Sequence, residues 1–212
     1  MAAERDNPSS AVLDATARPA PPDPLIVVVV DLLETEGYDA VQLREVARRA
    51  RMSLSTIYKR YATREDLIAA ALQWWVDANR YAPLVVDTTE RADESVPDGL
   101  LRIFRTIFRP WEQHPGMLKA YVRAQAGPNG KQLTRHGFDA VVPAVDAVLS
   151  STDPGFAEDL GMILSGVIFG SLHRFAAGEI AVTDILPSVE RTLYWMFNGY
   201  EQVTGGSAGT RH

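Results

Sequence analysis

The sequence predicts an all-α protein of about nine helices. Apolar residues recur at the three- and four-residue spacing of amphipathic helices along most of the chain. Helix-stopping segments such as Gly37 and residues 127–130 (GPNG) separate these stretches, and no convincing strand pattern appears. With 212 residues, 46% of them hydrophobic and 23% charged, the chain is long enough to form one large globular domain or two small ones.

The N-terminal part combines an arm with a first helix. Residues 1–23 are rich in Ala, Pro, Ser and Asp and lack an apolar core, so we expect a disordered arm and no signal peptide. Pro24 suits the first position of a helix that runs to Glu36 and is capped by Gly37. Residues 26–30 (IVVVV) favour a strand by propensity, but the helical segments that follow favour a helix here too.

Two short helices and a longer one come next. Apolar positions recur at helical spacing over residues 41–50, and a break at Arg51 leads to Ser53, a favourable N-cap residue for a short helix over 54–61. Thr63 is expected to cap the longer helix, with Asp66 three residues later completing a capping box.

The rest of the chain predicts five further helices. A polar stretch at 87–95 precedes the first of them, which includes residues 100–111 and in which Pro110 should cause a kink or an end. The others are expected at about 117–126, 131–150, 153–178 and 184–203, with a kink expected at Pro143 in the second of these four.

Positive charge is concentrated in one segment. Residues 42–64 hold seven Lys or Arg residues and one Glu, a local charge of +6, which leaves −12 on the rest of a chain whose net charge is −6. A basic island of this kind is the electrostatic footprint of a phosphate-binding surface. An Arg-rich helix face is also common as plain solvated surface, so charge alone leaves both readings open.

The two short helices have the outline of a helix-turn-helix. The second helix fits the major groove of B-DNA, about 12 Å wide, while the first braces it across the backbone. Hydroxyl and phenol groups can bond to phosphates or base edges, and a leucine can contact a thymine methyl group. The residues predicted to point outward are Leu54, Ser55, Thr56, Tyr58 and Lys59.

Four sequence pieces in this segment resemble the DNA-binding domain of the TetR family over roughly residues 23–72. They are residues 37–47, 50–53, 56–61 and 63–67 (GYDAVQLREVA, ARMS, TIYKRY and TREDL). The resemblance implies that the helix-turn-helix is 42–61, that Tyr58 contacts phosphate, and that Arg64 stands in place of a phosphate-contacting lysine. It also implies a homodimer, in most cases a repressor, whose C-terminal helices bind a small molecule that weakens DNA binding.

The chain departs from the family pattern at two positions. Gln42 stands where the family usually has a Thr cap, and Arg51 stands where it usually has the turn glycine. Arg51 must therefore adopt a left-handed conformation or the turn must be rearranged.

The expected partner is double-stranded DNA with a palindromic operator. The candidate DNA-binding residues are Arg44, Ser53, Leu54, Ser55, Thr56, Tyr58, Lys59, Arg60 and Arg64.

The C-terminal part carries more aromatic and methionine side chains than a tight helical bundle needs, which predicts a large, mainly apolar cavity. Any one of these side chains is also compatible with plain core packing. Residues 114–122 (HPGMLKAYV) resemble a segment of actinobacterial TetR-family regulators of sterol and lipid catabolism, which implies a small hydrophobic effector such as a lipid or its acyl thioester. The candidate ligand-binding residues are Trp75, Phe104, Phe108, Trp111, Tyr121, Gln125, Phe138, Met162, Phe169 and His173.

The last two helices are candidates for the dimer interface. Residues 160–172 are apolar almost all round, and small residues such as Gly166 and Gly170 allow close helix approach. A four-helix interface with a second copy would also use the apolar stripe of the last helix, and an intramolecular core is the alternative. That stripe consists of Val189, Leu193, Met196, Phe197 and Tyr200. The apolar stretch at 160–172 is too short to span a bilayer, so we expect a cytoplasmic protein with no membrane partner.

These observations predict a disordered arm at 1–23, a helix-turn-helix domain at 24–72, a helical effector-binding and dimerisation domain at 73–204, and a flexible tail at 205–212.

The absence of cysteine excludes disulfides and thiolate metal sites, and the four histidines show no metal-ligand spacing, so we expect no metal and no cofactor. Residues 205–209 (GGSAG) match a nucleophile elbow in letters only, because the elbow needs a flanking strand and helix. We therefore expect no enzyme. The alternative is an all-helical protein-interaction module that does not bind DNA.

Overall fold

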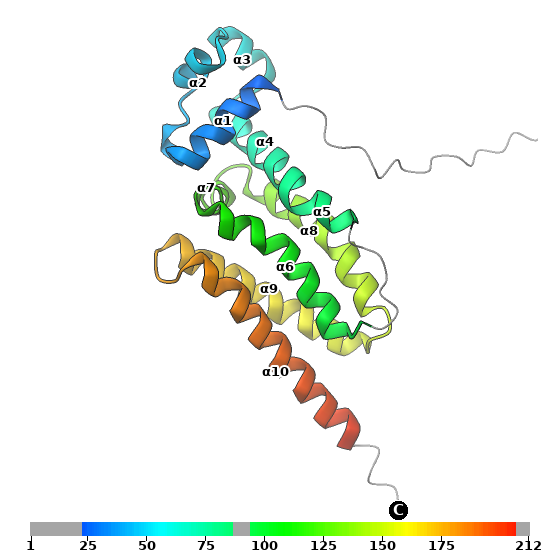
Figure 1. Cartoon of the computed structure of the whole chain (residues 1–212). Helices are drawn as coiled ribbons and strands as arrows, with labels where there is room; N and C mark the ends of the chain where they lie inside the picture. Colours follow the sequence, from blue (N-terminus) through cyan, green and yellow to red (C-terminus); the bar gives the residue numbers. More distant parts are fainter. Residues whose placement is uncertain (1–22, 87–93, 207–212) are drawn as a thin grey trace, which may run out of the picture.

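The computed structural model of the chain has the predicted all-α architecture (Figure 1). The structure describes residues 23–86 and 94–206, and within these ranges it contains helices and turns but no strand. The predicted disordered arm, apart from residue 23, and residues 207–212 of the predicted tail lie outside the described residues. A small N-terminal unit at one end of the molecule packs on a longer bundle of helices (Figure 1).

The N-terminal unit consists of α1 (Pro24–Thr35), α2 (Leu43–Ala50), α3 (Leu54–Arg60) and the first part of α4 (Arg64–Val76). The apolar run in α1 forms a helix because its side chains reach the core at helical spacing, with Leu25, Val29 and Leu32 completely buried. This burial outweighs the local preference of the run for a strand. The predicted capping box at the start of α4 is present, with Thr63 and Asp66 bonding to each other's backbone N–H groups.

The helix that begins with α4 is longer than a single regular α-helix. A π-helical turn, η2 (Asp77–Tyr81), connects α4 directly to α5 (Ala82–Val86), so the three segments form one continuous rod. With this rod taken as one helix, the described residues contain nine α-helices, in agreement with the sequence prediction. The π-turn directs Arg80 and Tyr81 into the bundle, where both side chains are buried.

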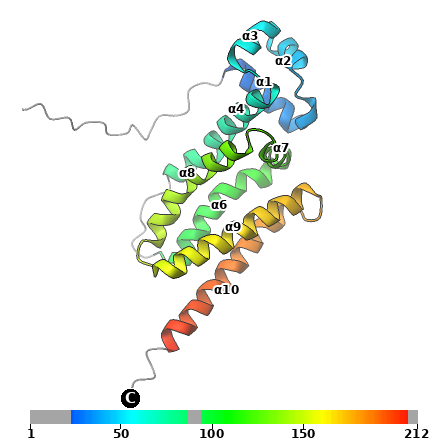
Figure 2. The same ribbon diagram turned by 180° about the vertical axis from the view of Figure 1, so that it is seen from behind.

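The bundle is completed by α6 (Val96–Gln113), α7 (Pro115–Gln125), α8 (Gly130–Leu149), α9 (Pro154–Ala176) and α10 (Ile185–Gly206). Pro110 does not end α6, because the helix continues to Gln113; the buried ring of Trp111 packs on Trp75 of α4 and fixes this last turn. Pro143 also lies within a continuous helix. α9 and α10 run side by side, and the C-terminal half of α10 extends beyond the other helices (Figures 1 and 2).

The N-terminal unit contacts the bundle at the end where α7 begins. Gly116 lies so close to α1 that an added Cβ atom would be 2.8 Å from the carbonyl oxygen of Glu34. The Glu34 carboxylate also bonds to His114 Nδ1 at 3.1 Å. A bidentate ion pair joins Arg123 of α7 to Asp39 in the turn between α1 and α2, at 2.6 and 2.7 Å. Polar contacts and a close backbone approach therefore fix the bundle to the N-terminal unit.

α9 differs from the other helices in how little of it is covered. It is 23 residues long and, by length and composition, apolar enough to cross a membrane, which corrects the prediction that its apolar stretch is too short. Only 22% of its most apolar 18-residue window is buried within the chain. The core helix of a soluble protein passes the same length and composition test but is mostly buried, so the exposed face of α9 calls for a covering surface.

Candidate nucleic-acid interface and internal cavity

Of the five α3 residues predicted to point outward, three are exposed, whereas Thr56 is half-buried and Leu54 is half-buried against the core. Ile57 is completely buried and anchors α3, whereas Tyr58 is 56% exposed and Ser55 and Lys59 are exposed. Ser53 caps the helix by accepting a hydrogen bond from the backbone N–H of Thr56 at 3.1 Å. The side-chain hydroxyl of Ser53 also lies 2.8 Å from that of Ser55 and 2.9 Å from that of Thr56, so a hydroxyl cluster marks the N-terminal end of α3.

Arg51 adopts the left-handed conformation, with φ 54° and ψ 40°, one of the two possibilities expected from the sequence. The turn is therefore retained without glycine, and the backbone N–H of Arg51 bonds to the carbonyl groups of Ala47 and Arg48. The other departure from the family pattern also shows in the structure. Gln42 makes no side-chain capping bond to α2 and donates instead to the carbonyl oxygen of Asp39 at 2.9 Å.

Much of the positive charge of this segment is neutralised locally. Glu45 accepts hydrogen bonds from both Arg48 and Arg49 at 2.6 Å, and these bonds lower the pKa of Glu45 to about 2. Arg60 forms an ion pair with Asp23 at 2.5 Å. Three exposed cations of the segment form no ion pair with any described residue, and these remain available to phosphate. They are Arg44, Arg51 and Lys59.

Arg64 occupies a different environment from these cations. Its side chain is only 19% exposed, and its guanidinium donates to the carbonyl oxygens of Val41 and Tyr38 and pairs with Glu65. It also lies over the ring of Tyr38, 4.8 Å from the centroid. Arg64 thus joins α4 to the turn before α2, and its donors are largely occupied by the protein itself.

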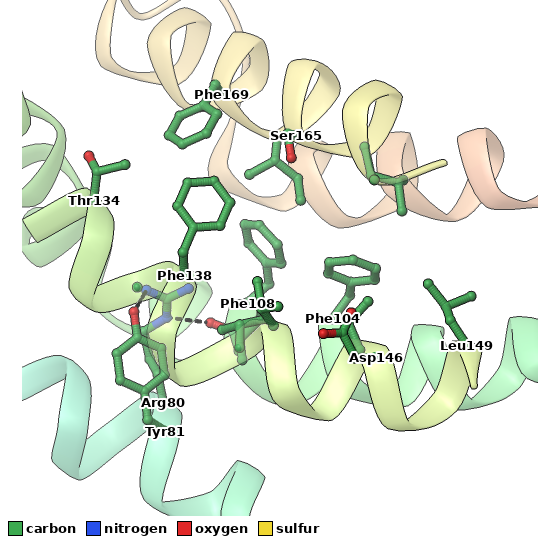
Figure 3. A pocket seen from close by; sticks show the side chains of 18 of the residues that line it. Arg80, Tyr81, Phe104, Phe108, Thr134, Phe138, Asp146, Leu149, Ser165 and Phe169 are labelled. Atoms are coloured by element: carbon green, nitrogen blue, oxygen red, sulfur yellow. Dashed lines mark hydrogen bonds between the residues drawn. The ribbon is translucent and has the colours of Figure 1, made fainter. Parts of the chain in front are cut away.

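A cavity of about 550 Å³, partly open to solvent, lies in the bundle between η2, α6, α7, α8 and α9 (Figure 3). This volume falls in the range of about 300–1,000 Å³ that is usual for small-molecule sites. Its walls are mainly aromatic and aliphatic. Seven of the ten predicted ligand-binding residues line it, namely Phe104, Phe108, Trp111, Tyr121, Gln125, Phe138 and Phe169.

The other three predicted residues do not line the cavity. Trp75 lies behind it, stacked on Trp111 with ring centroids 4.8 Å apart. Met162 is 69% exposed on the outer face of α9. His173 is also exposed, with Nδ1 2.8 Å from the carbonyl oxygen of Phe169 in its own helix. The sequence of α9 is apolar on every side, so it did not reveal which face turns inward.

The sequence reasoning missed the two most polar residues at one end of the cavity, Arg80 and Tyr81. Arg80 is 7% exposed, and burial lowers the pKa of its guanidinium. Burial also raises the pKa of the nearby Tyr121 phenol. A signal was present, because Arg80 follows the buried residues Leu72 and Val76 at four-residue intervals and so belongs to the inner face of the helix.

A chain of ring contacts runs from the cavity to α1. Trp111, in the cavity wall, stacks on Trp75 of α4. The ring of Trp75 also makes a T-shaped contact with the ring of His114, with the two ring centroids 5.5 Å apart. His114 in turn bonds to Glu34 of α1 at 3.1 Å. Because α1 and α4 pack against each other and α1 packs against α2, this chain ends at the helices that hold the helix-turn-helix.

Comparison with known proteins gives consistent matches. Residues 25–71 match the family described as "Bacterial regulatory proteins, tetR family", and residues 94–196 match "Tetracyclin repressor-like, C-terminal domain". HTH-type transcriptional regulators of Mycobacterium bovis and Mycobacterium tuberculosis are each 27% identical over 187 residues, covering 84% of this chain and 86% of theirs.

Solved structures share the fold. A TetR transcriptional regulator from Rhodococcus sp. RHA1 is 16% identical with a TM-score of 0.61, over 82% of this chain and 93% of that one. Another from Legionella pneumophila is 17% identical with a TM-score of 0.57, over 81% and 94% respectively.

The left-handed turn residue gives a stability prediction. Replacing Arg51→Gly removes a steric cost of about 1–2 kcal/mol, offset in part by the backbone entropy of glycine, so we expect a net stabilisation of up to about 1 kcal/mol. Arg51→Ala is the matched control, because it removes the charge but keeps the Cβ atom. Urea unfolding at one protein concentration measures both, and equal stability of the two variants would contradict the steric reason.

The unequal pairing of the cations gives a DNA-binding prediction. Arg44→Ala should reduce the slope of log K against log salt concentration by about 0.9 for each phosphate that the variant no longer binds. Arg48→Ala, in the same helix, should leave the slope almost unchanged, because Glu45 already neutralises that guanidinium. The measurement is a salt titration of DNA binding by fluorescence anisotropy. Equal slopes for Arg44→Ala and the wild type would exclude Arg44 as a phosphate-binding residue.

Proposed function

Because the chain belongs to the TetR family of bacterial regulatory proteins, we propose that this DNA-binding transcriptional regulator is a dimeric repressor, released from a palindromic operator by a small ligand. The ligand would occupy the cavity between η2 and α9. The observation that carries the proposal is the position of Trp111, which lines the cavity and also stacks on the helix that supports the DNA-reading unit.

Ligand release requires that the cavity and α3 respond to each other. A ligand that moves Trp111 would move Trp75 of α4 with it, and the His114–Glu34 contact would pass the change to α1. A reorientation of the reading unit would then alter the spacing of two α3 helices on DNA. Coupling of this kind is usually about 1–3 kcal/mol and is reciprocal, so operator DNA should weaken ligand binding by the same factor.

The proposed dimer surface is the outer face of α9 and α10. Met162, Tyr194 and Trp195 are each more than 60% exposed there, and Cβ atoms added at Gly166 and Gly170 would meet nothing within 4 Å. A second copy of the chain could approach this face closely and cover its apolar side chains.

Part of the predicted apolar stripe of α10 serves the chain's own core instead. Val189 is completely buried and Leu193 is 1% exposed, so the stripe is wrong as a dimer surface at these two positions. The α10 side chains proposed to meet a partner are instead Tyr194 and Trp195, one and two positions after Leu193.

The proposal retains the domain division made from the sequence, with DNA binding in residues 24–72 and effector binding and dimerisation in residues 73–204. The DNA-reading set also stays as predicted, except that we assign Arg64 and Arg60 to positioning because both guanidinium groups are paired within the chain. A regulator that acts on chromosomal DNA works in the cytoplasm.

The operator is the first property to test. Selection of bound genomic fragments should return an inverted repeat whose half-sites are about 34–36 Å apart, or a multiple of that distance. Lys59→Ala should change which bases are preferred, since one good base contact is worth roughly ten- to hundredfold in discrimination. Lys131→Ala, which changes an exposed lysine of α8, is the control. Recovery of the wild-type consensus at full stringency by Lys59→Ala would remove Lys59 from the reading face.

The dimer surface gives a second prediction. Gly166→Leu or Gly170→Leu should push the paired helices apart, and overpacking of this kind commonly costs about 1–3 kcal/mol. Each variant should shift toward monomer in analytical ultracentrifugation and lose binding to the palindrome, while circular dichroism shows unchanged helix content. Gln132→Leu, which places the same side chain on an exposed part of α8, should remain dimeric. A glycine variant that stays dimeric and binds DNA normally would locate the interface elsewhere.

A further inference from the structure

The cavity has a polar end that a purely apolar ligand would not use. The polar residues that line the cavity at this end or next to it are Arg80, Tyr81, Tyr121, Gln125 and Thr134. Figure 3 shows Arg80 and Tyr81 on the same side as Thr134 and Phe138. The opposite side is formed by groups such as Phe104 and Leu149 (Figure 3). The cavity therefore has two chemically different ends.

Arg80 is a buried cation that forms no ion pair with any described residue. Its Nε donates to the carbonyl oxygen of Ile107 at 2.8 Å and its Nη1 to the phenol oxygen of Tyr81 at 3.3 Å. Its guanidinium also lies over the ring of Trp111, 4.5 Å from the centroid. No described carboxylate pairs with it. A buried charge is normally paired, because removal from water costs several kcal/mol that a neutral environment does not return.

The groups around Arg80 can complete a binding site for an anionic oxygen. The phenol oxygens of Tyr81 and Tyr121 both approach Gly137 of α8, where an added Cβ atom would be 3.2 and 3.6 Å from them. Glycine at this position leaves room beside two hydroxyl groups next to the guanidinium. Gln125 donates to the hydroxyl of Thr134 at 3.2 Å and adds a further polar group at the same end.

The charge of the cavity changes sign along its length. Among the described lining residues Arg80 is the only lysine or arginine, while Asp146 and Glu158, both exposed, line the cavity from α8 and from the first part of α9. Figure 3 shows Asp146 beside Phe104, away from Arg80. A second hollow outside the Arg80 end shares Gln125, Thr134 and Phe138 with the cavity and is lined by Lys131 and Arg135 as well as Asp139. An anion is therefore attracted to the Arg80 end and repelled from the other.

We propose that the effector is an amphipathic carboxylate, with its carboxylate at Arg80 and its apolar chain or ring system between Phe104, Phe108 and Leu164. This inference rests on the proposed role of the cavity as an effector site and names the chemistry of its ligand. A single guanidinium balances one negative charge, so a carboxylate fits better than a dianionic phosphate. Two carboxylate oxygens can share the free donors of Arg80 and the Tyr81 phenol as charge-assisted hydrogen bonds, while the Tyr121 phenol donates to the carbonyl oxygen of Leu133 at 3.2 Å.

The test compares decanoate with decan-1-ol, which has the same chain and a neutral head, by isothermal titration calorimetry on the full-length protein. The wild type should bind decanoate at least about tenfold more tightly than decan-1-ol. In Arg80→Met, decanoate should bind no better than decan-1-ol, while the affinity for decan-1-ol stays the same or rises. Arg109→Met, which changes an exposed arginine of α6, should keep the wild-type preference.

Three results would overturn the assignment. They are equal binding of decanoate and decan-1-ol by the wild type, an unchanged preference for decanoate in Arg80→Met, and no binding of either compound. Tighter binding of decyl phosphate than of decanoate at pH 8 would overturn the choice of a carboxylate. Only the second result needs a variant, so the proposal stays testable even if Arg80→Met fails to fold.

DNA release is measured separately, by adding each compound to the protein bound to a selected genomic fragment. If decanoate binds through Arg80 but leaves DNA affinity unchanged, the carboxylate site stands and the proposed switch is wrong. If decan-1-ol binds as tightly as decanoate and releases DNA, the switch stands and the carboxylate site is wrong. The two proposals therefore fail independently.

Discussion

The buried indole of Trp111 is the contact on which the rest of the structure depends. It packs against three neighbours at once, the ring of Trp75 at 4.8 Å, the guanidinium of Arg80 at 4.5 Å and the ring of Tyr121 at 5.4 Å. These neighbours come from α4, η2 and α7, so one side chain joins the cavity wall to the rod that enters the N-terminal unit. Close-packed interiors shift between discrete arrangements, which lets a small movement at such a point be felt at a distance.

Electrostatics in the two halves of the chain follow opposite rules. On the surface of the N-terminal unit, acidic side chains neutralise most of the arginines and leave only a few cations free for an external polyanion. Inside the bundle, Arg80 lies in a largely apolar wall and pairs with no carboxylate in the described part of the chain. An exposed unpaired cation has little effect on the stability of the fold because water screens its charge. A buried unpaired cation lowers that stability strongly. Burial thus separates the exposed cations of the N-terminal unit from the arginine in the cavity wall.

Sequence reasoning succeeded where structure is decided by local chemistry. The caps at Ser53 and Thr63 could be recognised because each depends on a few adjacent residues, and the left-handed conformation of Arg51 was one of two possibilities that the sequence left open. It failed where tertiary packing decides, since an all-round apolar helix such as α9 does not reveal which face turns inward, and Met162 was placed on the wrong side. Arg80 was missed because charged residues are almost never fully buried, although its spacing from Val76 indicated the inner face.

The contact between Gly116 and the Glu34 carbonyl has a consequence for protein engineering. Regulators with new specificities are often imagined as interchangeable modules, with a DNA reader from one protein grafted onto a sensor from another. Here the backbone of α7 approaches α1 so closely that no side chain fits between them, and the flanking bonds of His114 and Arg123 match particular acidic residues of the reader. A chimera cut after α4 would have to carry the end of α1 and the turn after it as a matched set with the sensor.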